Sequence, residues 1–186
     1  RPAGPATRQD RGGRVPADWS AGKEGACDGW PYRYFGQHGD ARVLPGGAQR
    51  VWSGIVPDFA LGAHTASLGL AFDTGDAFPS RYKGGAFVGQ HGSWNRRPAV
   101  GYRVAFVAFA DGQPQGLPED FLSGFLDSRG HARGPPGGVA FDAQGDLLVA
   151  DDVRGRSGPV RRAAAGRLRR AAFSPWRVLA PLGSFS

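Results

Sequence analysis

The sequence predicts an all-β fold built from β-propeller blades, and three observations predict it. Short apolar runs recur along the middle of the chain, each bounded by turn residues. Apolar residues show no helical spacing of 3.6 before the Ala- and Arg-rich C-terminal part. A strand motif with its turn occurs twice, at 69–73 and at 138–142. The 31 glycines and 15 prolines of the 186-residue chain suit short strands joined by turns.

The predicted strands are short, and turn residues separate them. The longest, at 102–109, alternates apolar with other residues and ends at the turn Asp111-Gly112. Turn residues at 74–76 and 144–146 separate the others. The five predicted strands are 67–72, 85–89, 102–109, 138–142 and 147–150.

The internal repeat favours propeller blades over unrelated hairpins. Gly69-Leu70-Ala71-Phe72-Asp73 recurs 69 residues later as Gly138-Val139-Ala140-Phe141-Asp142, and a Gly-Asp turn follows both copies. Repetition at a fixed spacing is typical of radially arranged sheets. The alternative is two separate hairpins that share a common strand motif. A propeller ring closes with about four blades or more, and this chain supplies about two.

Composition divides the chain into three parts. Residues 1–18 are rich in Arg, Gly and Pro and show no hydrophobic period, so we expect an irregular or disordered segment. Residues 19–152 hold the predicted partial propeller. Residues 153–186 form a basic tail rich in Arg, Ala, Gly and Pro.

The basic character belongs to the tail. The chain carries a formal net charge of +7, but residues 153–186 hold eight arginines and no acidic residue. The remaining part carries 15 basic and 16 acidic residues. A basic tail binds phosphates nonspecifically, so we expect no specific nucleic-acid partner. No apolar run reaches the ~18 residues of a membrane helix, which predicts no membrane span.

Three groups of residues, in order along the chain, carry a family resemblance. They are Lys-Glu-Gly at 23–25 with Gly-Trp-Pro-Tyr at 29–32 and Tyr-Phe-Gly-Gln-His at 34–38, then the segment 57–72, then the segment 82–96 with its Gly-Gln-His-Gly-Ser-Trp-Asn-Arg end. From about Val15 to Asp152 the chain resembles the glucose/sorbosone dehydrogenase family, with the L-sorbosone dehydrogenase type most similar.

The resemblance implies a six-bladed propeller that holds pyrroloquinoline quinone (PQQ) near its central channel, usually with calcium (Ca2+). Its implied activity is the oxidation of a sugar or sugar aldehyde by hydride transfer to the quinone, followed by transfer to an electron acceptor. It implies a periplasmic or secreted protein, although the chain shows no signal peptide. The family's general base and most of its metal positions lie before the Gly-Trp-Pro motif. We therefore assign no catalytic or metal-binding residue and expect the chain alone to be inactive. The alternative is a non-catalytic propeller segment used for binding.

Five residues are candidate cofactor contacts: His64, His91, Asn95, Arg96 and Arg133. His64 precedes a predicted strand, and the next three follow one in a loop flanked by glycine. PQQ is an anionic tricarboxylate, and Arg and His donate charge-assisted hydrogen bonds to such groups. Two alternatives stay open. His64 can instead be a structural residue that caps strand ends, and residues 94–96 can be a turn with an exposed arginine.

The chain departs from the family pattern at two places that bear on the site. Where the family reads Arg-Pro-Val-Gly-Val, this chain has Pro135 in place of the arginine. Arg133 can replace that contact only if the loop aims it differently. After Asp152 the family pattern stops, and we expect residues 153–186, together with 1–13, to be frame-shifted or truncated ends. The alternative is a genuine basic tail with a helix around 161–172.

The sequence contains no other catalytic motif: a nucleophile elbow, a P-loop and a His-Glu-x-x-His zinc motif are all missing. Its one cysteine, Cys27, excludes an internal disulfide.

Overall fold

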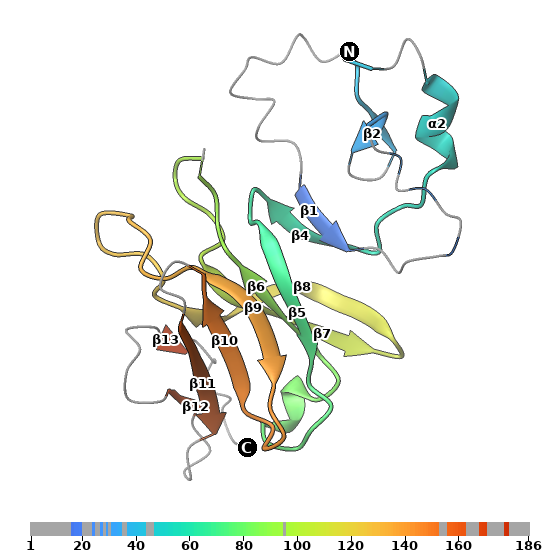
Figure 1. Cartoon of the computed structure of the whole chain (residues 1–186). Coiled ribbons are helices and arrows are strands. Elements are labelled where there is room, and N and C mark those ends of the chain that lie inside the picture. The colour runs from blue at the N-terminus through green and yellow to red at the C-terminus, as the bar shows by residue number, and fades with distance from the viewer. Residues whose placement is uncertain are drawn as a thin grey trace. The chain divides into compact units, whose positions relative to one another are not determined.

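The computed structural model describes residues 16–19, 24, 27, 29, 31–34, 37–43, 47–94, 96–152, 156–162, 168–170 and 177–178. These residues form short antiparallel sheets with almost no helix (Figure 1), which confirms the predicted all-β class. The chain divides into two compact units, residues 1–64 and 65–186.

The first unit contains two small sheets and a short helix. Strand β1 (Pro16–Trp19) pairs antiparallel with β4 (Phe59–Ala63), and β2 (Arg33–Tyr34) forms a hairpin with β3 (His38–Gly39). Helix α2 (Ala48–Ser53) has six residues and is followed by Gly54 in extended conformation.

Arg33 fixes the end of this helix. Its side chain is only 3% exposed, and its guanidinium donates to the carbonyl oxygens of Val51 and Ile55. A Cβ atom at Gly54 or Gly29 would overlap the arginine side chain, so a larger residue at either position would require Arg33 to move. These contacts explain locally why arginine and glycine occur together around the Gly-Trp-Pro-Tyr motif.

The second unit consists of two propeller blades. The first blade has the strand order β13-β8-β7-β6-β5. Each of its consecutive strands pairs antiparallel with the next, and a 3-10 helix at Ser80–Tyr82 lies between β5 and β6. The bounds are β5 (Ser67–Phe72), β6 (Ala86–Gln90), β7 (Arg103–Ala110), β8 (Gln113–Ser123) and β13 (Arg177–Val178).

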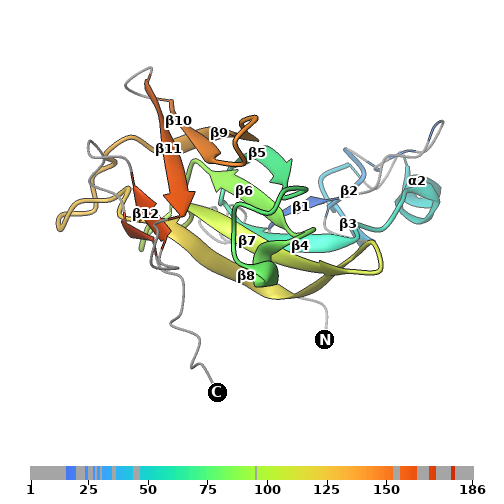
Figure 2. The ribbon, with the colours of Figure 1, turned by 90° about the horizontal axis from the view of Figure 1, so that it is seen from below.

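The second blade has the order β12-β11-β10-β9 and is again antiparallel throughout. Figure 2 shows β9 and β10 beside the sheet of the first blade. The bounds are β9 (Pro136–Phe141), β10 (Leu147–Asp151), β11 (Arg156–Arg162) and β12 (Leu168–Arg170).

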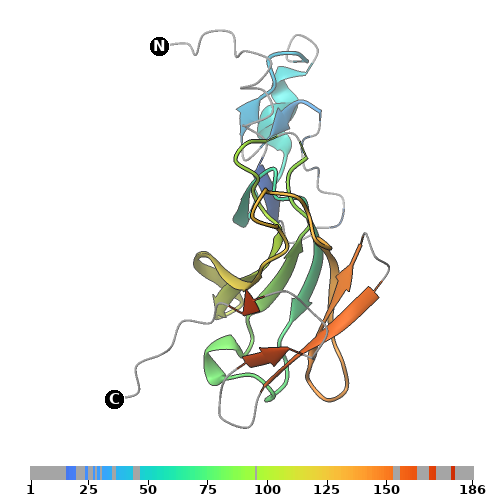
Figure 3. The same ribbon diagram turned by 90° about the vertical axis from the view of Figure 1, so that its left-hand side faces the viewer.

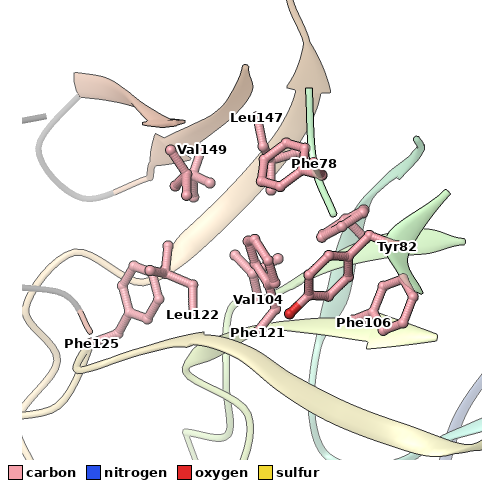
Figure 4. Packing of buried hydrophobic residues seen from close by; sticks show 11 residues of the cluster. Phe78, Tyr82, Val104, Phe106, Phe121, Leu122, Phe125, Leu147 and Val149 are labelled. Carbon is pink, nitrogen blue, oxygen red and sulfur yellow. The ribbon is translucent and has the colours of Figure 1, made fainter. Parts of the chain in front are cut away.

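A cluster of aromatic and aliphatic side chains fills the space between the two blades (Figure 4). The ring centroid of Phe87 lies 4.7 Å from that of Phe121 in the same blade and 5.5 Å from that of Phe141 in the second blade. Leu147 and Val149 of β10 are fully buried in the same cluster. Burying large apolar side chains from both sheets makes the two blades one packed body.

The backbones of the two blades also come close to each other at a glycine of β5. A Cβ atom at Gly69 of β5 would lie 2.6 Å from the backbone nitrogen of Val139 and 2.7 Å from the carbonyl oxygen of Gly137. Only a residue without a side chain permits this approach of β5 to β9. The first glycine of the repeat therefore has a packing function in the first blade.

The structure confirms all five predicted strands, as β5, β6, β7, β9 and β10. The sequence did not predict β8, nor the strands β11, β12 and β13 within the basic tail. Strand β11 pairs with β10 along its length, and Val160 is buried in the core. A helix over 161–172, the alternative for the tail, is wrong, because residues 161–162 and 168–170 are in strands. The boundaries at residues 18 and 152, and the frame-shift hypothesis, stay predictions.

Candidate functional site

One end of the second unit gathers most of the predicted contacts. Strands β5 and β9 begin at this end and β6 and β10 finish there, since each pair forms an antiparallel hairpin. The loops 91–102 and 124–135 therefore project from the same end of both blades (Figures 1 and 3). Loops at strand ends can vary in sequence without disturbing the sheets.

The loop 91–102 is anchored to the start of β5. The backbone N–H of His91 donates to the carbonyl of Ala66, and the N–H of Gly92 donates to the carbonyl of Thr65, both at 2.9 Å. His91 is thus held at the point where the sheet ends and the loop begins.

The same loop is closed internally by Ser93. Its N–H donates to the carbonyl of Val100 at 2.9 Å, and its hydroxyl accepts from the Val100 N–H at 3.0 Å. The Tyr102 hydroxyl donates to the Ser93 carbonyl at 2.6 Å. These three bonds fix the base of the loop in one conformation.

Gly101 allows the loop to close. Its φ of +78° is in the left-handed region, and a Cβ there would lie 2.7 Å from the Gly92 Cα and 2.8 Å from the Thr65 carbonyl oxygen. Both neighbouring atoms belong to the backbone, so neither can move away easily.

The far part of the loop presents an aromatic and a cationic side chain to solvent. Trp94 is 91% exposed, and Arg96 is exposed as well. Asn95, the predicted contact between them, lies outside the described residues. An exposed indole next to cationic groups offers a flat apolar surface on which a ring can stack.

His91 connects the two blades. Its Nε2 atom lies 3.1 Å from Oδ2 of Asp152, which directly follows β10. The His91 side chain is 31% exposed and that of Asp152 is 61% exposed. The N–H of Asp152 donates to the carbonyl of Pro135 at 3.2 Å, which fixes the backbone that carries the carboxylate.

Arg133 belongs to the second loop, 124–135, and is exposed. Its backbone N–H donates to the carbonyl of Phe125 at 2.7 Å, so the loop is closed just before β9. The next residue, Gly134, has a φ of +94°, and a Cβ there would overlap the carboxylate of the buried Asp151.

Asp127 organises the turn of this second loop. Its Oδ1 accepts the backbone N–H groups of Arg129 and His131, both at 2.8 Å. These bonds, first of all the N–H of His131, stabilise the charged carboxylate and lower the pKa of Asp127.

The structure thus brings His91, Arg96 and Arg133 to one end of two adjacent blades. His64 follows β4 in the first unit, where it is half-buried with a left-handed φ of +61°. It stays a predicted contact. Sequence reasoning considered residues 94–96 together but did not select Trp94 as a contact, and it missed the contact of Asp152 with His91.

The part of the chain that the structure describes contains neither a cluster of metal ligands nor a helix that could span a membrane. No three or more His, Cys, Asp or Glu side chains there lie close enough together to hold a metal ion. Its helices are too short to cross a membrane.

Comparison with known proteins identifies the family. The family model described as TrAA12-like matches residues 53–158, which is more than half of the chain. The chain belongs to the TrAA12-like family. The match includes both hairpins of the repeat and runs into β11.

Individual relatives of this TrAA12-like chain are larger proteins. An uncharacterized protein of Borreliella burgdorferi is 34% identical over 96 residues, which are 50% of this chain and 25% of the relative. The iodide structure of the Trichoderma reesei carbohydrate-active enzyme of family AA12 matches with a TM-score of 0.55 and 24% identity. That match covers 73% of this chain and 35% of the solved chain.

The calcium structure of the same fungal enzyme family gives a TM-score of 0.54 at 24% identity, over 78% of this chain and 37% of the solved one. The TrAA12-like chain thus spans a quarter of its curated relative and just over a third of these structures. At this identity the likeness concerns the fold, and it confirms the partial β-propeller.

Proposed function

We propose that this chain is part of a PQQ-dependent oxidoreductase that oxidises a sugar or sugar aldehyde. Membership of the TrAA12-like family supports the proposal, as does the resemblance of segments 23–38, 57–72 and 82–96 to the glucose/sorbosone dehydrogenases. The observation that carries it is that the loops 91–102 and 124–135, which hold His91, Arg96 and Arg133, project from the same end of two propeller blades.

The chemistry of these side chains fits PQQ. The cofactor carries three carboxylates on a planar ring system, and Arg96 and Arg133 are exposed permanent cations with several donors each. His91 offers its second ring nitrogen, and Trp94 offers an exposed aromatic face. Cationic donors around an aromatic surface are what a flat anion requires for tight binding.

Each residue then has a distinct function in binding. Arg96 and Arg133 would hold carboxylates of PQQ, and His91 would contact it from the base of the loop 91–102. Trp94 covers an apolar face of the cofactor or of the sugar ring. We retain His64 and Asn95 as further contacts. When bound, PQQ supplies the quinone that accepts the hydride of the substrate.

The finer assignments belong to the same proposal. Sorbosone is one candidate substrate, calcium is a candidate partner of the cofactor, and a periplasmic or secreted location suits a quinone enzyme of this resemblance. Because we assign no general base among these residues, we expect the chain by itself to bind PQQ without oxidising sugars.

PQQ titration of the purified chain, with and without calcium, tests this function. We expect a change in the quinone absorbance on binding, and no dye reduction with aldoses or sorbosone. Arg96→Gln and Arg133→Gln should each weaken binding by about tenfold, since each removes a charge-assisted contact. Arg129→Gln is the matched control, because Arg129 is exposed in the same loop as Arg133 but is assigned no contact. An unchanged quinone spectrum at saturating protein would refute the proposal.

A further inference from the structure

His91 and Asp152 form a side-chain contact to which the proposed binding of PQQ assigns no function. The two residues come from different blades, since His91 follows β6 and Asp152 follows β10. Their side chains meet at 3.1 Å between Nε2 and Oδ2. This contact connects the ends of the two blades beside the loop that carries Arg96.

The contact restricts what His91 can do. An imidazole has two nitrogens, and the one that contacts a carboxylate carries a proton. Among the residues that the structure describes, Nδ1 of His91 makes no hydrogen bond, and the side chain is 31% exposed. Nδ1 is therefore the ring nitrogen that these contacts leave for a ligand.

The backbone on both sides of the contact is fixed. The N–H of His91 donates to the carbonyl of Ala66, and the N–H of Asp152 donates to the carbonyl of Pro135, so hydrogen bonds hold the backbone at both residues. A contact between two anchored residues can orient an imidazole, as carboxylates do for metal-bound histidines.

We propose that Asp152 is a positioning residue for His91. Its carboxylate holds Nε2 from the neighbouring blade and directs Nδ1 toward the cofactor. This inference rests on the proposed function, because it assigns a purpose to a residue beside that site. Asp152 itself touches neither cofactor nor substrate.

Two variants distinguish the effect of Asp152 on the orientation of the His91 ring from the effect of its negative charge. Asp152→Asn keeps an oxygen that can accept from Nε2 but removes the negative charge, whereas Asp152→Ala removes both. The matched control is Asp76→Asn, which removes an exposed carboxylate that pairs with Lys83 in the turn after β5, at the other end of the blade.

The first measurement needs no cofactor. Long-range proton–nitrogen NMR spectra of the imidazoles contain few signals, because the chain has four histidines. We expect Asp152→Ala to shift both ring-nitrogen signals of His91, Asp152→Asn to shift them less, and Asp76→Asn to leave them unchanged. A cooperative thermal unfolding transition shows that each variant is folded. If Asp152→Ala does not fold, Asp152→Asn alone tests the inference.

The second measurement is PQQ affinity. We expect Asp152→Ala to weaken binding about fivefold, in keeping with the loss of one partly exposed polar contact, and Asp152→Asn to weaken it less. If the His91 signals do not move, or if both variants bind PQQ like the unchanged chain, the positioning function of Asp152 is refuted while PQQ binding stands. If the unchanged chain does not bind PQQ, the proposed function fails and this inference fails with it.

Discussion

Asp73 and Asp142 occupy the same position in the two copies of the repeat, but their carboxylates have different surroundings. Asp142 is half-buried, and its Oδ1 accepts the N–H groups of Gln144 and Asp146, both at 2.9 Å. Asp73 is only 1% exposed, and its Oδ1 accepts from Gly75 at 3.0 Å. Its Oδ2 is buried without a hydrogen-bond partner among the described residues. In the same sequence motif, the carboxylate of Asp142 thus accepts two backbone hydrogen bonds, whereas one oxygen of Asp73 is buried without a partner among the described residues.

This difference predicts a pH-dependent stability that Asp73 controls. Burial raises the pKa of Asp73 above its ordinary value of 3.8, because the charged form is poorly solvated. A carboxyl whose folded pKa is raised contributes stability that is full below the unfolded value and is lost as pH rises through the folded one. Asp73→Asn should therefore reduce the fall in melting temperature between about pH 4 and pH 7, by an amount of the order of a few degrees.

Thermal unfolding at a series of pH values measures this effect. Asp142→Asn is the matched control from the second copy of the repeat, and it should not stabilise the protein at neutral pH, because it weakens two existing backbone contacts. Equal pH profiles for the Asp73→Asn variant and the unchanged chain would contradict the prediction.

At the scale of elements, loop closure depends on glycine where the backbone of one strand end meets another. Gly101 and Gly112 both have left-handed φ values, +78° and +73°. A Cβ at Gly101 would contact two backbone groups, whereas one at Gly112 would meet nothing within 4 Å. The pair separates the cost of an unfavourable backbone conformation from the cost of a steric clash.

Gly101→Ala should destabilise the protein more than Gly112→Ala. We expect about 1 kcal/mol for Gly112→Ala, from the left-handed conformation alone, and roughly 2–4 kcal/mol for Gly101→Ala, which adds overlap with Gly92 and Thr65. Urea unfolding measures both. The Gly101 variant should also lose PQQ affinity, because the loop that carries Trp94 and Arg96 can no longer close on β5. Equal costs for the two variants would show that the loop adapts without strain.

The sequence predicted those strands whose own residues show the pattern of a strand, an apolar run between turn residues. Strands β5, β6, β7, β9 and β10 are apolar runs between turn residues, so their bounds were predicted to within one or two residues. Strand β8 was missed because two prolines, a glycine and five polar residues interrupt its apolar pattern, although it pairs with β7. Strand β11 was missed because it is rich in arginine, and among its residues only the side chain of Val160 is described, in the core.

The sequence could propose single residues of the site, but not the contacts between them. His91 and Arg96 were proposed from residue type and from their place after a predicted strand. Arg133 was proposed because it lies near Pro135, where the resembling family has arginine. All three stay predictions. The contact between His91 and Asp152 depends on how two blades pack, and no local pattern records that. For the same reason, the sequence did not indicate that Trp94 is exposed.

At the scale of the whole molecule, the two copies of the repeat are not equivalent, because one blade lies against the other. Gly69 of the first copy lies so close to β9 that a Cβ atom there would be 2.6 Å from the backbone nitrogen of Val139. Its counterpart Gly138 would place a Cβ 3.8 Å from that of Ala150, an ordinary contact. The first glycine is required by the interface between blades, and the second is not.

Gly69→Ala should therefore separate the blades, whereas Gly138→Ala should be tolerated. The Gly69 variant must shift β9 as a whole, since the obstacle is backbone, and we expect a loss of roughly 1–3 kcal/mol in the free energy of unfolding. Gly138→Ala should change stability by about 0.5 kcal/mol or less, and can stabilise the strand, where glycine is unfavourable. Urea unfolding measures both variants, and the His91 imidazole signals report on the contact between the blade ends. Because His91 and Asp152 belong to different blades, a displaced β9 should shift those signals in the Gly69 variant alone. Equal stability and unchanged signals in both variants would mean that the blades are not packed through Gly69.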